Sequence, residues 1–260
     1  MKNPYYTPYV GNKRKEIKDI LPLINLDNIT TILEPFAGSS VMSYYISTQY
    51  PKRFKYILND NDKINYDLYN ISRDIERTEE FNEKINKIID VFNTYTDDVS
   101  RKAFYITIDI KTLEGYIFKC KYYNMRPGLY PIIPRYKNIK PFKLQDCPIY
   151  DFFNNEDIIY ENIDGVEFIN KHIQEEHKLF LLDPPYLDSC NEFYNNVDMN
   201  IYEWIVDNKS LLLDSKNKIM FILQNTRTIK LLLKDFKVTF EYNKTYSLSN
   251  KKTTHIVYEN

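Results

Sequence analysis

The sequence predicts an α/β protein that is built on a doubly wound sheet and carries one insertion. An apolar run, a helical pattern and a second apolar run follow one another at residues 30–34, 39–49 and 54–58. Strand, helix and strand in this order open such sheets. Strand-like runs return only after residue 145, and the stretch before it is helical and then basic. We therefore expect one sheet domain, residues 1–62 and 145–260, and an inserted subdomain, residues 63–144.

The elements after the insertion alternate as an α/β sheet requires. Each strand candidate is short and apolar, which is typical of a buried strand. These candidates are residues 158–160, 179–182, 218–223, 238–242 and 254–258. Helical patterns at residues 201–213 and 228–233 lie between them.

The predicted insertion has a helical first half and a basic second half. Apolar residues in the first half recur at spacings of three and four, at Phe81, Ile85, Ile88, Ile89 and Phe92. Residues 101–143 contain ten Lys or Arg and two Asp or Glu, a local formal charge of 10 − 2 = +8, with six tyrosines and four prolines interleaved. Such a segment can neutralise the phosphates of a nucleic acid. The alternative is a solvated basic surface.

Composition excludes several classes of protein. A hydrophobic fraction of 43% argues against disorder. No run approaches the roughly 20 apolar residues of a membrane span, and no signal peptide is visible. The odd set Cys120, Cys147 and Cys190 predicts reduced thiols in an intracellular protein. His172 and His177, with these cysteines, lack ligand spacing, so we predict no metal site.

A glycine turn follows the first predicted strand, at residues 34–40, Glu-Pro-Phe-Ala-Gly-Ser-Ser. Ligands bind at the carboxyl ends of strands in such sheets, and Gly38 lets a ligand approach the backbone. Ser39 and Ser40 are candidates to cap the following helix. Asp60 ends the second strand, where an acid can bind ribose hydroxyls. The alternatives are a tight turn without a ligand and a helix cap at Asp60.

A second motif, Asp183-Pro184-Pro185-Tyr186, directly follows a buried strand. The prolines fix the backbone and remove two N–H donors, so the carboxylate and nearby carbonyls form a rigid cluster of acceptors. Acceptors of this kind can draw an aromatic amino group toward tetrahedral geometry and free its lone pair. Tyr186 offers a flat face on which an extruded base can stack. The alternative is a turn that the prolines make rigid.

Four blocks in this order resemble the Dam-like family of adenine-specific DNA methyltransferases: residues 9–13, 34–40, 58–60 and 183–186. The resemblance implies a Rossmann-like class I methyltransferase sheet with an inserted target-recognition subdomain. It also implies transfer of a methyl group from S-adenosylmethionine to the N6 amino group of a flipped adenine in double-stranded DNA. A GATC-like target is plausible by this resemblance only.

The resemblance also implies the site residues. The catalytic residues would be Asp183, Pro184, Pro185 and Tyr186. The cofactor would be held by Tyr9, Gly11, Asn12, Lys13, Glu34, Pro35, Phe36, Ala37, Gly38, Ser39, Asp60 and Asp164. DNA contacts would come from Lys121, Tyr123, Asn124, Arg126, Arg135 and Lys137. Arg126 and Arg135 flank the proline-rich loop and are the leading candidates for base or phosphate contacts.

The sequence departs from the family pattern at three places. The second glycine of the turn is Ser40, one extra residue stands between Tyr130 and Pro134, and His255 replaces an acid that is frequent before the last strand. Two alternatives therefore stay open. One is the same chemistry on RNA adenine or on a cytosine amino group, and the other is a DNA-binding homologue that has lost catalysis.

Overall fold

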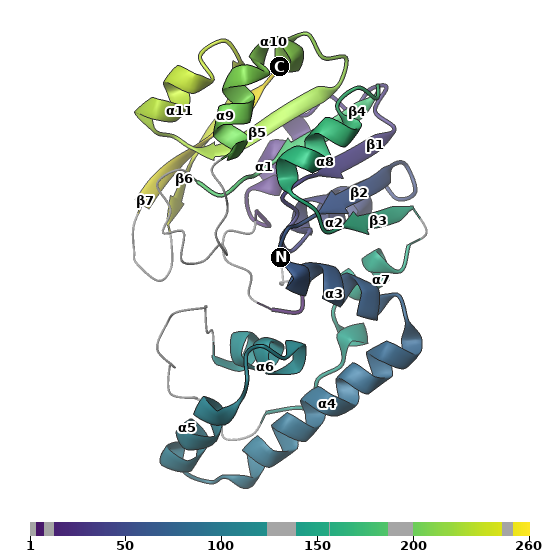
Figure 1. The fold of residues 1–260 in the computed structure, drawn as a ribbon, viewed down its shortest axis with the longest axis vertical. Coiled ribbons are helices and arrows are strands. Elements are labelled where there is room, and N and C mark those ends of the chain that lie inside the picture. The colour runs from purple at the N-terminus through teal and green to yellow at the C-terminus, as the bar shows by residue number, and fades with distance from the viewer. Residues whose placement is uncertain (1–3, 8–12, 124–138, 156, 187–199, 246–251) are drawn as a thin grey trace. The chain divides into compact units, whose positions relative to one another are not determined.

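The computed structural model of the chain describes residues 4–7, 13–123, 139–155, 157–186, 200–245 and 252–260 (Figure 1). It forms two compact units. The sheet unit comprises residues 13–63 and 156–260, and the helical unit comprises residues 1–12 and 64–155. The helical unit thus takes in the N-terminal segment and extends beyond the predicted insertion to residue 155.

The sheet unit contains a seven-stranded sheet in the order β3-β2-β1-β4-β5-β7-β6. Strands β1 to β5 pair in parallel, and β7 pairs antiparallel with both β5 and β6. The strands are β1 (Thr31–Glu34), β2 (Lys55–Asn59), β3 (Ile158–Glu161), β4 (Lys178–Leu182), β5 (Lys218–Gln224), β6 (Lys237–Thr245) and β7 (Lys252–Glu259). This order, with an antiparallel last hairpin, is typical of class I methyltransferases, so the predicted fold class is confirmed.

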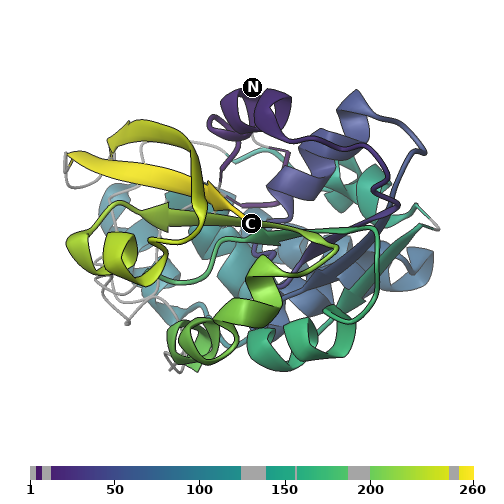
Figure 2. The same cartoon turned by 90° about the horizontal axis from the view of Figure 1, so that it is seen from above.

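Helices cover both faces of the sheet (Figure 2). One face carries α1 (Ile17–Ile20) and α2 (Val41–Gln49), and the other carries α8 (Gly165–His172), α9 (Asn200–Asp207), α10 (Lys209–Leu213) and α11 (Arg227–Leu232). The core beneath α8 and α9 joins Leu33 and Phe180 of the central strands to Phe168 and Ile205 of the helices. Burying such a side chain contributes about 1.5–3 kcal/mol, which is why nearly continuous apolar runs form these strands.

Two predicted elements differ in length from those observed. The helix predicted over residues 201–213 is two helices, α9 and α10, because Asn208 leaves helical geometry at φ −108° and ψ 17°. The closing hairpin continues to the pair Thr245 and Lys252. The outer half of this hairpin is polar, so the apolar pattern that predicted strands at residues 238–242 and 254–258 does not extend into it.

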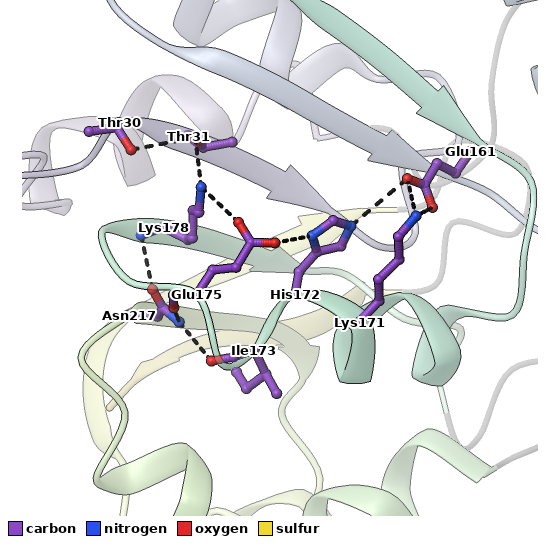
Figure 3. Close-up of polar contacts among 9 residues, drawn as sticks. All are labelled: Thr30, Thr31, Glu161, Lys171, His172, Ile173, Glu175, Lys178 and Asn217. Atoms are coloured by element: carbon purple, nitrogen blue, oxygen red, sulfur yellow. Dashed lines mark hydrogen bonds and ion pairs between the residues drawn. The ribbon is translucent and has the colours of Figure 1, made fainter.

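A polar network ties together the amino ends of the central strands (Figure 3). Glu175 accepts from Lys178 Nζ at 3.0 Å and lies 2.7 Å from His172 Nδ1. Lys178 Nζ also donates to Thr31 Oγ1 at 3.2 Å, and its backbone N–H donates to Asn217 Oδ1 at 3.0 Å. Because Thr31 and Lys178 begin β1 and β4, the network fixes the sheet at the edge opposite to the carboxyl ends of these strands.

The helical unit contains α3 (Lys63–Ser72, whose first residue belongs to the sheet unit), α4 (Ile75–Thr94), α5 (Asp98–Thr107), α6 (Leu113–Tyr123), η2 (Leu144–Asp146) and α7 (Ile149–Phe153). Asp74 and Asp97 cap α4 and α5 through their carboxylates. Two tyrosines anchor the N-terminal segment to α3. Tyr5 Oη donates to Asn65 Oδ1 at 2.7 Å, and Tyr6 Oη lies 2.5 Å from Ser72 Oγ.

A row of asparagines on α4 holds an extended segment of the helical unit. Asn93 pairs with both backbone groups of Ile139 at 2.8 and 2.9 Å, and Asn86 pairs in the same way with Phe142 at 2.7 and 2.9 Å. Each amide thus satisfies a donor and an acceptor that a neighbouring strand would otherwise satisfy. The helical prediction for the first half of the insertion is confirmed, and these asparagine side chains give the polar face of α4 a packing role.

Within the described ranges, no helix combines the length and the apolar character that crossing a membrane requires.

Candidate active site

Three neighbouring strands bring the predicted site residues to one edge of the sheet. β1 lies between β2 and β4 and runs parallel to both. Their carboxyl ends therefore meet, and Glu34, Asp60 and Asp183 lie at or directly after these ends. This edge is where α/β sheets bind ligands.

The glycine turn after β1 has two residues in the left-handed region. Gly38 has φ 49° and Ser40 has φ 51°. Asp60 stabilises the turn, because its Oδ2 accepts from the Gly38 N–H at 2.6 Å and its Oδ1 accepts from the Asp62 N–H at 2.8 Å. The acid predicted to bind ribose thus also holds the backbone of the turn.

Ser40 does not cap α2 as predicted. It stands at the N-cap position, but its side chain makes no capping hydrogen bond. Left-handed geometry directs the side chain away from the first turn, and the buried hydroxyl has no hydrogen-bond partner within the described part of the chain. A non-glycine residue in this conformation costs about 1–2 kcal/mol. The left-handed backbone at this position therefore favours glycine over serine.

Asn59 connects the turn to the loop after β3. Its buried amide donates to the carbonyls of Pro35 and Ile163, both at 3.0 Å, and accepts from the Ile163 N–H at 3.0 Å. The preceding loop residue, Asn162, donates to the Asp60 carbonyl at 2.7 Å. Asn59 was not among the predicted site residues, although an asparagine directly after a predicted apolar strand was the available signal.

Asp164 and Gly165 position the start of α8 against the turn. Asp164 Oδ1 accepts from the N–H groups of Val166 and Glu167 at 2.8 and 3.1 Å, so this predicted cofactor residue is also a helix cap. A Cβ at Gly165 would lie 2.3 Å from the Phe36 ring. Gly165 therefore allows Phe36 to pack on α8 beside the glycine turn.

The motif after β4 makes a network with the N-terminal end of the sheet unit. Lys13 and Asp183 form an ion pair between Nζ and Oδ2, and their side chains are 2% and 16% exposed. Tyr186 Oη donates to Asp183 Oδ1 at 3.2 Å, and Lys13 Nζ lies 5.4 Å from the centroid of the Tyr186 ring. Tyr202 on α9 donates to the Pro185 carbonyl at 2.9 Å. Asp183 thus lies at the tip of a buried strand with both carboxylate oxygens oriented.

Burial and neighbouring charges set the electrostatics of this edge. Burial lowers the pKa of Lys13, and the charge of Asp183 opposes that shift. Burial raises the pKa of Glu34 to about 8, and the charges of Asp183 and Asp60 add to the increase. Three carboxyl groups are therefore close enough to interact. The carboxylate of Asp60 and the absence of a side chain at Gly38 fit a cofactor that carries a positive charge and approaches the backbone of the turn.

Several predicted residues lie outside the described part of the chain. These are Tyr9, Gly11 and Asn12 of the cofactor set and Asn124, Arg126, Arg135 and Lys137 of the DNA set. Lys121 and Tyr123 end α6, and their side chains are not described. Among the described side chains, no three His, Cys, Asp or Glu residues are grouped as metal ligands.

A family model described as D12 class N6 adenine-specific DNA methyltransferase matches residues 9–248. The chain belongs to this family. It is therefore an enzyme that uses S-adenosylmethionine to methylate the N6 amino group of adenine in DNA. The family, activity and cofactor that the sequence resemblance implied are confirmed.

Other comparisons add little to the D12 assignment. None of the curated proteins matches the sequence. The solved structure titled "delta-N METTL16 MTase domain" is 11% identical, with a TM-score of 0.42 and coverage of 96% of this chain and 83% of that chain. "Human methyltransferase 10 domain containing protein" is 8% identical, with a TM-score of 0.38 and coverage of 95% and 80%. The fold assignment depends on the strand order and not on these two similarities.

The conformation of Ser40 predicts that Ser40→Gly stabilises the enzyme. Glycine removes the left-handed strain and the unpaired hydroxyl, at some cost in chain entropy, so the free energy of unfolding should rise by about 1 kcal/mol. Ser40→Ala is the matched control, because it removes the hydroxyl and keeps the strained Cβ. Denaturant unfolding should rank glycine above alanine, and the reverse order would contradict the strain argument.

The raised pKa of Glu34 predicts a specific pH dependence of stability. The folded state keeps the Glu34 proton, while the unfolded chain, with a pKa near 4.5, releases it. This group's contribution is therefore fully present below about pH 4.5 and is lost as the pH rises to about 8. Glu34→Gln removes the titrating group. The free energy of unfolding of this variant, measured relative to that of wild type, should therefore increase between about pH 4.5 and about pH 8. A difference that does not change with pH would show that Glu34 titrates normally.

Proposed function

We propose that this D12 enzyme methylates a specific site in double-stranded DNA and that Asp183 is the acceptor that activates the target amino group. The observation that carries the proposal is the position of Asp183 at the tip of β4, next to β1 and its glycine turn, in an ion pair with Lys13. A carboxylate in this position can reach a base from the side that also faces the cofactor turn.

Asp183 would act by accepting a hydrogen bond from the adenine amino group. Each carboxylate oxygen has a second lone-pair site, so the contacts with Lys13 and Tyr186 leave acceptor capacity. The Pro184 carbonyl would accept the other N–H, which draws the nitrogen toward tetrahedral geometry. The ion pair with Lys13 orients the Asp183 carboxylate. The Tyr186 ring would stack on the extruded base.

The cofactor supplies an electrophilic methyl group on a positively charged sulfur when it is bound. We assign its binding to the glycine turn and the acids around it. The residues are Tyr9, Gly11, Asn12, Lys13, Glu34, Pro35, Phe36, Ala37, Gly38, Ser39, Asp60 and Asp164. The hydrogen bond of Asp60 to Gly38 and the link through Asn59 support this assignment, since both hold the turn in a fixed shape before any ligand binds.

The DNA contacts would come from the basic stretch, residues 101–143, with its formal charge of +8. Counterion release from the duplex would supply much of the affinity, and arginine can read guanine edges. We assign these contacts to Lys121, Tyr123, Asn124, Arg126, Arg135 and Lys137. In this scheme residues 1–62 and 145–260 carry catalysis and residues 63–144 recognise the target. The enzyme would act inside the cell, where its DNA is.

Asp183→Ala tests the catalytic assignment. It should lower the rate of methyl transfer to duplex DNA by about a thousandfold or more, because the oriented acceptor is lost. DNA affinity should stay near the wild-type value.

The Asp183→Ala variant also leaves Lys13 buried without the charge of Asp183, which lowers stability. Asp183→Asn is therefore the matched control, because it keeps the shape of the side chain. Labelled-methyl incorporation, a gel-shift assay and circular dichroism measure the three properties. Near-wild-type turnover in both variants would refute the assignment.

Arg126→Ala tests target reading. Loss of a base contact should reduce discrimination against one altered base pair by about 1–3 kcal/mol. Loss of a phosphate contact should instead weaken binding to all sequences and reduce its salt dependence. Arg126→Lys separates these cases, because lysine keeps the charge and loses the bidentate geometry. The measurement is methylation of a substrate panel with single base-pair changes, and an unchanged site preference and affinity would remove Arg126 from the DNA surface.

A further inference from the structure

His255 lies near the centre of the last strand, β7. It is fully buried and stands between Gln224 of β5 and Tyr242 of β6 in the register of the sheet. Its imidazole stacks on the Tyr242 ring, with centroids 5.4 Å apart and an interplanar angle of 25°. The strand and the stacked tyrosine together hold the imidazole in one orientation.

The same imidazole contacts the tyrosine of the catalytic motif. The rings of Tyr186 and His255 meet edge to face, with centroids 5.1 Å apart and an angle of 78°. His255 Nδ1 lies 3.3 Å from Tyr186 Oη, which in turn donates to Asp183 Oδ1 at 3.2 Å. A continuous row of polar atoms therefore runs from β7 to the carboxylate at the tip of β4.

The chemistry of these groups determines which of them donates each hydrogen bond. A tyrosine hydroxyl has one proton, and a carboxylate only accepts, so the proton of Tyr186 goes to Asp183. His255 must then donate from Nδ1, which defines its neutral tautomer. Burial lowers the pKa of His255 to about 3, and the charges of Lys13 and Lys244 contribute. The imidazole is therefore neutral at physiological pH and can keep this tautomer.

We propose that His255 is a positioning residue for methyl transfer: its Nδ1–H donates to the Tyr186 hydroxyl, directs that hydroxyl toward Asp183 and fixes the ring that faces the target base. The inference rests on the proposed roles of Asp183 and Tyr186. A carboxylate at position 255 could only accept, and it would compete with Asp183 for the tyrosine proton. Histidine at this position therefore gives this enzyme a donor that an acid does not offer.

The first test compares three substitutions of His255. His255→Phe keeps the ring and removes the donor, and it should lower kcat roughly tenfold while KM for DNA and for S-adenosylmethionine changes less than about twofold. His255→Asn places an amide donor near the Nδ1 position and should recover most of kcat. His255→Gln places its amide near the Nε2 position and should not. The Asn and Gln variants keep the test valid if the Phe variant folds poorly, and equal kcat for these two would overturn the proposal.

His172→Phe is the control for losing a buried histidine. His172 packs on Phe168 and contacts Glu175 in the network at the other edge of the sheet (Figure 3). Its substitution should lower the unfolding temperature and leave kcat of the folded enzyme at the wild-type value. If His172→Phe lowers kcat as much as His255→Phe, then His255 has only a structural role.

A double-mutant cycle isolates the contact with Tyr186. In the Tyr186→Phe background the hydroxyl is absent, so adding His255→Phe should not reduce kcat further. A full additional tenfold loss would overturn the inference. A different result would contradict the proposed function itself, namely wild-type turnover in Asp183→Ala. The inference alone fails if Asp183→Ala is inactive and His255→Phe has wild-type kcat.

Discussion

The buried ion pair between Lys13 and Asp183 is the interaction on which the geometry of the site depends. Removing one partner of an ion pair that is largely shielded from water costs stability, because the other charge then loses a compensating interaction. The pair holds the start of the sheet unit against the tip of β4 and leaves acceptor capacity on both oxygens of Asp183. If Asp183 has the proposed catalytic role, substitutions at this contact affect both stability and catalysis.

Strand order extends this arrangement to the cofactor side. Because β1 lies between β2 and β4, the glycine turn, Asp60 and Asp183 meet without any long loop. Asn59 then links the turn to the loop before α8 through three hydrogen bonds. Hydrogen bonds from side chains to the backbone therefore hold the glycine turn and order it before a ligand binds. Burial, with a smaller contribution from the charges of Asp183 and Asp60, raises the pKa of Glu34 at this edge.

Two departures from the family pattern, Ser40 and His255, have different physical consequences. Ser40 has left-handed backbone geometry, which favours glycine. It therefore lowers stability, and its hydroxyl makes no compensating hydrogen bond among the described residues. His255 has several contacts, with Tyr242, Tyr186 and the neighbouring strands. One substitution thus introduces strain beside the cofactor turn. The other places an imidazole within hydrogen-bonding distance of the Tyr186 hydroxyl.

The sequence by itself determined the seven strands along the chain, the glycine turn, the Asp183 motif and the family, because short apolar runs and residues adjacent along the chain specify them. Only the tertiary structure decided that Lys13 pairs with Asp183, 170 positions away, and that His255 contacts Tyr186, 69 positions away. It also decided that Ser40 is left-handed and that Asn59 bridges two loops. Such contacts depend on strand order and register, which no local pattern specifies.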